Sequence, residues 1–195
     1  RSKAVKLAKF FKIPFIAKNI NELYKKTKSD LVIVAVNETS TEKICFNCFK
    51  FPWKIFVEKP VGYNFKIAKK IYEESLIYKS KLLVAMNRRH YSSTKSLLKL
   101  IKNANGKKII TIIDSQDLNL AKKFKTPEII LKNYMFANSV HLIDYFNFIK
   151  KSDIKKIQTI VKNRSFISAI ISFKNGDIGN YICYWNRPGP WSVNL

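Results

Sequence analysis

Three short apolar runs, separated by segments with helical spacing, constrain this chain more than any other feature. The runs are Leu31–Val36, Trp53–Val57 and Leu82–Met86. Between them, residues 42–51 and 65–78 place apolar side chains every three or four positions, as helices do. Strands joined by helices in this rhythm form a parallel sheet with helices on both sides. We therefore predict an α/β fold that begins with a partial Rossmann-like domain over residues 1–87.

The first apolar run has the features of a strand covered on both faces. It is continuous and mostly β-branched, with no alternation of polar residues. Upstream of it we expect helices over residues 3–11 and 21–26 and a short strand at Phe15–Ala17.

After Asn87 the pattern changes. Helices are expected at 93–101 and 140–149, and strands at 108–114, 157–161, 165–173 and 178–184. The last two strands flank Asn175-Gly176, a strong hairpin signal. Residues 88–195 should therefore form a second, α+β domain with a mainly antiparallel open sheet.

The charge of the chain raises the question of a polyanionic partner. The formal net charge is +24, and a dense positive surface attracts nucleic acid. Lysine supplies nearly all of this excess, whereas nucleic-acid readers rely on the forked donors of arginine. Abundant lysine, isoleucine, asparagine and phenylalanine also follow from an A+T-rich coding sequence. We expect no nucleic-acid partner, and keep a basic binding module as an alternative that predicts a lysine stripe and salt-sensitive binding.

The cysteines and the apolar stretches bear on location. Three cysteines do not make a disulfide framework, which favours a reducing compartment. Cys45 and Cys48 share helical spacing with Ile44 and Phe49, so they are expected in a buried helix face and not at a metal site. No apolar stretch is long enough to span a bilayer, and the first residues lack a signal peptide's apolar centre. We expect a cytoplasmic protein with no membrane partner.

Polar residues follow each of the three predicted strands. Asn37 and Glu38 follow the first, Glu58-Lys59-Pro60 the second, and Asn87 with Arg88 the third. Ligands of open α/β sheets bind outside the carboxyl ends of the strands. These residues are therefore candidates for a ligand site, although a strand-exit turn at Asn37 and surface ion pairs at the arginines are open alternatives.

Four segments in series resemble the Gfo/Idh/MocA family of NAD(P)-dependent oxidoreductases, which act mainly on sugars, nucleotide sugars and inositols. They are residues 29–36, 56–60, 86–89 and 139–144. Two departures stand out. None of the five glycines lies between a first strand and helix, where the family has its phosphate loop, and Ala137 stands where the family often has an aspartate. The resemblance therefore implies a fragment lacking the N-terminal Gly-rich loop and the C-terminal end, and we expect these residues alone to bind nicotinamide cofactors poorly.

The resemblance implies roles for individual residues. Lys59 and His141 are the expected catalytic pair: one takes the hydroxyl proton of a carbinol and the other stabilises the developing alkoxide. His141 is expected in the first turn of a helix capped by Asn138 or Ser139, where the helix dipole favours neutral imidazole, and Asp144 could orient its ring. A solvated Lys59 and a structural His141 are the alternatives.

The remaining implied contacts are with cofactor and substrate. NAD or NADP is expected against Asn37, Glu38, Glu58, Pro60, Asn87 and Arg88. A sugar or nucleotide sugar is expected against Lys59, Asn138, His141, Asp144, Arg187 and Trp191. For Arg187 and Trp191, a Pro-rich turn at the rim of a sheet is an open alternative. The resemblance also leaves open a homo-oligomer formed through the second-domain sheet, and a catalytically idle relative that binds sugar without turnover.

Overall fold

The chain forms two compact units. The structure is a computed structural model that describes residues 2–102, 104–150, 152–162 and 166–195. One unit comprises Arg1–Ala85 and the other Met86–Leu195.

The first unit contains a parallel three-stranded sheet, as predicted. Its elements are α1 (Ser2–Phe10), α2 (Ile20–Thr27), β1 (Leu31–Val34), α3 (Thr41–Phe49), β2 (Lys54–Val57), α4 (Phe65–Ile77) and β3 (Leu82–Val84). The strand order is β1-β2-β3, and both neighbouring pairs are parallel. The three apolar runs of the sequence thus lie side by side, with their carboxyl ends at one edge of the sheet.

The prediction of helices on both sides of this sheet is wrong for the described residues. Val34, Ile55 and Val57 are buried under α3 and α4, whereas Leu31 and Ile33 on the opposite face are 48% and 65% exposed. Because the strands follow one another in one direction across the sheet, both crossover helices fall on the same face. The β-branched run of β1 is therefore covered on one face only.

The short strand expected at Phe15–Ala17 is also wrong. These residues form no strand, and the described residues of the first unit offer them no strand partner. A strand needs a neighbour for its backbone N–H and C=O groups, which apolar composition alone does not supply. The segment instead leads to Asn19, whose side-chain oxygen caps α2 by accepting from the Glu22 N–H at 2.8 Å.

The second unit is built around a five-stranded sheet. Its elements are η1 (Asn87–His90), α5 (Ser92–Lys102), β4 (Ile109–Ser115), α6 (Leu118–Lys123), α7 (Glu128–Lys132), η2 (Met135–Ser139), α8 (Val140–Lys150), β5 (Ile154–Lys162), β6 (Phe166–Phe173), β7 (Ile178–Tyr184) and β8 (Ser192–Asn194). The order is β5-β6-β7-β4-β8, antiparallel except between β4 and β7. The prediction of a mainly antiparallel sheet is confirmed, although Ser165, where one strand was expected to begin, lies outside the described residues.

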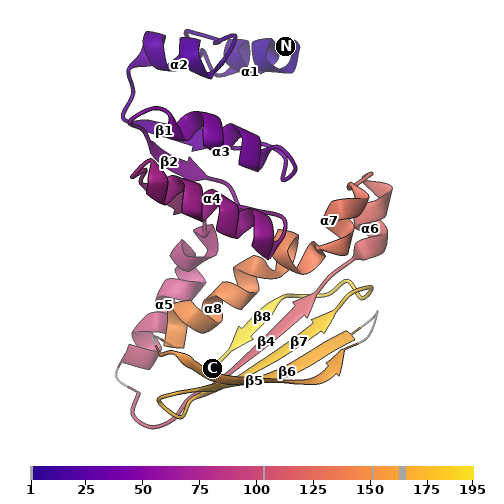
Figure 1. Cartoon of the computed structure of the whole chain (residues 1–195). Coiled ribbons are helices and arrows are strands. Elements are labelled where there is room, and N and C mark those ends of the chain that lie inside the picture. The colour runs from indigo at the N-terminus through magenta and orange to yellow at the C-terminus, as the bar shows by residue number, and fades with distance from the viewer. Residues whose placement is uncertain (1, 103, 151, 163–165) are drawn as a thin grey trace. The chain divides into compact units, whose positions relative to one another are not determined.

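The predicted hairpin joins β6 to β7. Gly176 has a φ of +87°, a conformation that favours glycine, and its N–H donates to the Phe173 carbonyl at 3.0 Å. α8 packs on one face of the sheet, where Leu142, Phe146 and Ile149 join the core of the unit (Figure 1). This packing fixes the helix that carries His141 to the sheet.

Candidate functional site

The segment after β2 places Glu58, Lys59 and Pro60 at the sheet's carboxyl edge. The Glu58 N–H donates to the Val34 carbonyl at 2.8 Å, so the pairing of β1 and β2 extends to this residue. Glu58 is exposed, Lys59 is half-buried and Pro60 is buried. The Lys59–Pro60 peptide bond is cis. α4 begins only at Phe65, so Pro60 is not the first residue of a helix.

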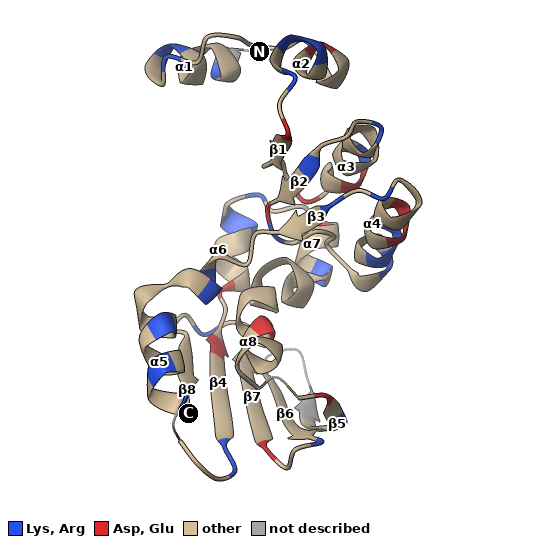
Figure 2. Ribbon diagram, turned by 90° about the vertical axis from the view of Figure 1, so that its left-hand side faces the viewer, with Lys and Arg blue, Asp and Glu red and all other residues tan. Residues whose placement is uncertain are grey.

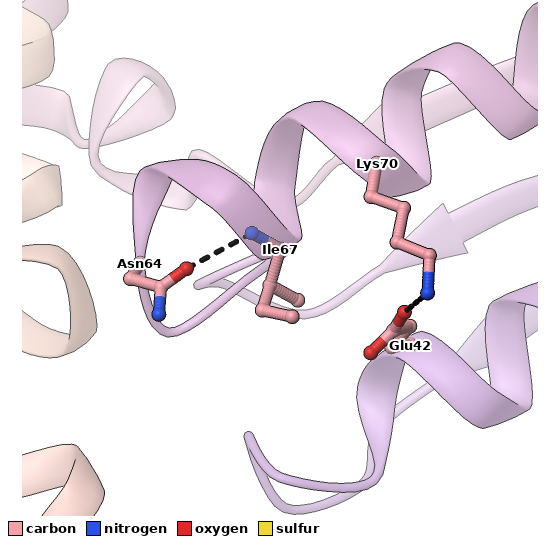
Figure 3. A network of polar contacts seen from close by, with 4 residues as sticks. All are labelled: Glu42, Asn64, Ile67 and Lys70. Atoms are coloured by element: carbon pink, nitrogen blue, oxygen red, sulfur yellow. Dashed lines mark hydrogen bonds and ion pairs between the residues drawn. The ribbon is translucent and has the colours of Figure 1, made fainter.

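The loop after Pro60 is packed tightly against the start of α4. A Cβ atom added to Gly62 would lie 2.4 Å from the backbone nitrogen of Ala68. Asn64 caps the helix, since its Oδ1 accepts from the Ile67 N–H at 2.9 Å (Figure 3). One turn further, Lys70 pairs with Glu42 of α3 at 2.5 Å. The chain around Lys59 is thus held at both ends, by β2 and by α4.

The residues after β1 form a local turn. The Asn37 Oδ1 accepts from the Ser40 N–H at 3.1 Å and from the Thr39 hydroxyl at 3.3 Å, which leads the chain into α3. Asn37 is exposed and Glu38 is half-buried. The amide oxygen of Asn37 is therefore already used, as the strand-exit alternative predicts, and its contact with a cofactor stays a prediction.

Asn87 and Arg88 belong to η1 in the second unit. Asn87 is exposed, while the Arg88 guanidinium lies 4.1 Å from the centre of the Trp191 ring. The Trp191 indole N–H donates to the Ser115 carbonyl at 2.5 Å, so this pair is anchored to β4. Arg88 and Trp191 line a pocket of about 380 Å³ together with Tyr145 of α8.

Arg187 and Trp191 have different partners. The Arg187 guanidinium lies 5.6 Å from the Tyr184 ring centre, whereas Arg88 covers one face of Trp191. Trp191 is 44% exposed. A sugar could stack on at most the remaining face of this indole, so the joint role of the two residues stays a prediction.

His141 does not lie in a capped first turn, and that expectation is wrong. Met135–Ser139 form a π-helical turn that continues directly into α8, so Asn138 and Ser139 are themselves helical. The N–H groups near His141 therefore face preceding helical carbonyls, and the helix-terminus argument for a neutral imidazole does not apply. His141 is 7% exposed.

Asp144 forms a two-point ion pair with Arg89. The Arg89 Nε and Nη2 lie 2.6 and 2.5 Å from the two carboxylate oxygens, and the guanidinium lies 5.1 Å from the Phe148 ring centre. Hydrogen bonding to Asp144 raises the pKa of Arg89 above its usual value. Arg89 therefore forms an ion pair, which is the alternative considered for the arginines in the sequence. Both oxygens of the Asp144 carboxylate accept from Arg89.

A buried polar cluster in the second unit was missed in the sequence. Asp114 is fully buried and Gln116 is 2% exposed, and they bond to Tyr181 and to Asn138 respectively. A signal was available: Asp114 follows Ile110 and Ile112 at alternate positions of a strand, which places an acid on the core-facing side. A buried acid at such a position requires hydrogen-bond donors around it.

The cysteines pack in the cores, as predicted for Cys45 and Cys48. All three are free and buried, and burial raises the pKa of Cys45 to about 12 and of Cys48 to about 11. Cys183 lies beside Asp114, and burial with that carboxylate raises its pKa to about 12. Residues 2–102, 104–150, 152–162 and 166–195 contain no cluster of three or more His, Cys, Asp or Glu side chains suited to a metal ion.

Basic residues occur on many elements of both units. In Figure 2 lysine and arginine are distributed over helices and loops, including α2, α4 and α5. None of the helices in the described part of the chain is long and apolar enough to cross a membrane.

Three solved structures illustrate the similarity of the fold. An oxidoreductase from Thermotoga maritima shares 20% identity with a TM-score of 0.80, over 99% of this chain and 64% of its own. UDP-N-acetylglucosamine 3-dehydrogenase from Acidithiobacillus ferrooxidans shares 10% with a TM-score of 0.74, over 97% and 60%. Scyllo-inositol dehydrogenase from Lactobacillus casei shares 14% with a TM-score of 0.65, over 90% and 55%. The chain therefore spans about three-fifths of the length of these proteins.

A family profile matches the first part of the sequence. No curated protein matches it. Residues 1–88 match the profile of the Gfo/Idh/MocA family, described as an oxidoreductase family with an NAD-binding Rossmann fold. These are the residues that form the parallel sheet and carry Glu58-Lys59-Pro60. Over residues 1–88 the chain is therefore similar to the Gfo/Idh/MocA oxidoreductase family.

Proposed function

We propose that the chain belongs to an enzyme that transfers a hydride between NAD or NADP and a carbinol of a sugar, nucleotide sugar or related polyol. The observation that carries this proposal is a half-buried Lys59 at the carboxyl end of β2, within the segment that matches an NAD-binding family. The names of two similar structures, a nucleotide-sugar dehydrogenase and an inositol dehydrogenase, support polyols as the substrate class.

We propose residues 1–87 as the cofactor domain. Glu58 and Glu38 follow β2 and β1, where carboxylates suit the hydroxyl groups of a ribose. Asn37, Pro60, Asn87 and Arg88 are the other proposed cofactor contacts. The bound nicotinamide would supply the hydride chemistry, and these side chains would bind and orient it.

We propose residues 88–195 as the substrate domain, with Lys59 and His141 as the proton-handling groups. Oxidation of a carbinol releases the hydroxyl proton, which a lysine amine or an imidazole can accept. The closely packed loop around Lys59 and the packing of α8 would limit the motion of both groups. Asn138, Asp144, Arg187 and Trp191 are the proposed substrate contacts, and a cytoplasmic location suits three free thiols.

The test uses a full-length protein that contains this sequence. Reduction of NAD and of NADP is followed at 340 nm with a panel of sugars, nucleotide sugars and inositols. Lys59→Met and His141→Gln should each lower kcat by about 10²- to 10⁴-fold, as expected for loss of a general acid or base. Lys54→Met, at the opposite end of β2, and His90→Gln, at an exposed histidine, are matched controls that should change kcat less than about twofold.

Three results would decide against the assignment. Turnover that survives both site substitutions undiminished would remove Lys59 and His141 from the chemistry. Sugar binding by calorimetry without any nicotinamide turnover would favour an idle relative, an alternative supported by Ala137 at the position of the family's aspartate. Binding to duplex DNA that weakens steeply with salt would favour a basic binding module.

We also propose self-association through the exposed face of the second-unit sheet. Ile109 and Ile170 on this face are 55% and 40% exposed. Sedimentation of the wild type and of Ile170→Lys would test it: the variant should be monomeric if this face joins two copies.

A further inference from the structure

A chain of hydrogen bonds links the core of the second unit to the turn before His141. Tyr181 of β7 donates its hydroxyl to Asp114 Oδ2 at 2.7 Å. Gln116 Nε2 donates to Asp114 Oδ1 and lies 3.3 Å from Ser139 Oγ. Asn138 Nδ2 then donates to Gln116 Oε1 at 2.7 Å. The chain thus runs from a buried carboxylate through one amide to a second amide.

The direction of these bonds follows from the carboxylate. Gln116 Nε2 donates to Asp114 Oδ1, so the NH₂ group of Gln116 faces the carboxylate. The amide oxygen of Gln116 then faces Asn138, and it accepts a hydrogen bond from the NH₂ group of Asn138. The Oδ1 atom of Asn138 is therefore at the end of this series of hydrogen bonds, on the side away from Gln116, and it can act as an acceptor.

The two ends of this chain are held firmly. Burial, and then the charge of Asp114, raise the pKa of Tyr181, so that its hydroxyl stays protonated and donates. The Gln116 backbone N–H donates to the Tyr184 carbonyl at 2.7 Å, which fixes the residue to the end of β7. With Asp114 fully buried and Gln116 2% exposed, water cannot readily replace either partner.

The chain ends on the π-helical turn that leads into α8. Asn138 and Ser139 lie in Met135–Ser139, three and two residues before His141. A π turn holds one residue more than an α turn, so it rotates the residues before it relative to those after it. Gln116, which directly follows β4, bonds to both Asn138 and Ser139 and so links this turn to the end of β4. The bonds therefore fix both the turn and the amide of Asn138.

We propose that Asp114 and Gln116 are positioning residues that fix Asn138 with its carbonyl oxygen turned outward, as the acceptor for a hydroxyl group of the substrate. The inference rests on the proposed function only for the origin of that hydroxyl group, a sugar or polyol. The proposed arrangement gives the site an amide oxygen at position 138, next to Ala137, where the family often has an aspartate.

The first test needs no substrate. Hydrogen exchange of the Asn138 side-chain NH₂ group is measured by NMR on the chain, and the signal is assigned by its absence in Asn138→Asp. Gln116→Met keeps the volume but removes the acceptor, and should speed this exchange about tenfold, the factor expected for loss of one hydrogen bond. Thr111→Val removes the 3.3 Å partner of the Asn180 amide on the same sheet and should leave the Asn138 signal unchanged. Equal Asn138 exchange in wild type and Gln116→Met would overturn the proposal.

A second variant tests the direction of the bonds. Asn138→Asp sets a carboxylate against the oxygen of Gln116, which raises the pKa of the new acid above its unfolded value. Its melting temperature should fall below that of the wild type at pH 7, and the deficit should shrink as the pH falls and the acid is protonated. A wild-type melting temperature at pH 7, or a deficit independent of pH, would contradict the assigned direction.

The substrate role is tested in the full-length protein. Gln116→Met should raise KM for the polyol about tenfold and leave KM for the nicotinamide cofactor unchanged. An unchanged polyol KM would overturn the acceptor role even with the expected exchange result. If the wild type turns over no polyol, the proposed function fails, whereas the exchange and melting results still decide the direction of the bonds.

Discussion

The Arg89–Asp144 pair gives a quantitative prediction about the second unit. The two side chains are 38% and 12% exposed, and two short hydrogen bonds join them. Fully exposed pairs contribute about 0.2–1 kcal/mol, whereas breaking a fully buried pair costs about 3–5 kcal/mol. Arg89 is exposed enough for water to screen it, so we expect a coupling free energy of about 1.5–2 kcal/mol, between these limits.

A double-mutant cycle measures this coupling. Arg89→Met, Asp144→Asn and the double variant are unfolded in urea, which does not screen charges. With tryptophan replaced by 5-fluorotryptophan, ¹⁹F NMR separates the units, because Trp53 lies in the first core and Trp185 in the second. At a slope of about 2 kcal/mol per M, each single variant should shift the Trp185 midpoint by roughly 1 M and leave that of Trp53 unchanged.

The pH dependence supplies a further check. The pKa of Arg89 is raised in the folded protein, so its contribution is fully present below the unfolded pKa and is lost only as the pH rises through the folded value. The coupling should therefore be constant between about pH 6 and pH 9. A coupling below about 0.5 kcal/mol would refute the reasoning, because the pair would then behave as an exposed one.

Three further predictions concern packing and capping. Gly62→Ala should destabilise the first unit by about 2–4 kcal/mol in urea, because the backbone of Ala68 cannot move away from the new Cβ without disrupting α4; an unchanged Trp53 midpoint would contradict this. In the same assay Asn64→Ala should lower the stability of the first unit by about 1 kcal/mol, because the helix cap is lost. Lys70→Met changes a side chain that is 58% exposed and should lower it by less than about 0.5 kcal/mol. A larger loss for Lys70→Met than for Asn64→Ala would count against the capping argument. The three buried cysteines should not react with Ellman's reagent at pH 8 until denaturant is added. Their raised pKa values leave a thiolate fraction of about 10⁻³ or less at that pH. One rapidly reacting thiol in the native protein would be inconsistent with this burial.

Local patterns were sufficient for the elements that depend on neighbours in sequence. The apolar runs became β1, β2 and β3, and the helical spacing between them became α3 and α4. Asn175-Gly176 became the predicted hairpin because only a few residues determine a tight turn. The helical face of Cys45 and Cys48 was likewise readable from spacing alone.

Contacts between distant residues could not be read in this way. Phe15–Ala17 has the composition of a strand, but strand formation requires a paired neighbour. Arg89 and Asp144 are 55 residues apart, and Tyr181 and Asp114 are 67 apart. Nothing in the local pattern of either partner indicates the other.

By itself the sequence determined the alternation of strands and helices and the polar residues at the strand ends, because both follow from periodicity over a few residues. The tertiary structure decided which face of the first sheet is covered, how the π turn leads to His141, and which donors surround Asp114. These features depend on the direction of crossovers and on the burial of polar groups, which arise only when distant segments pack together.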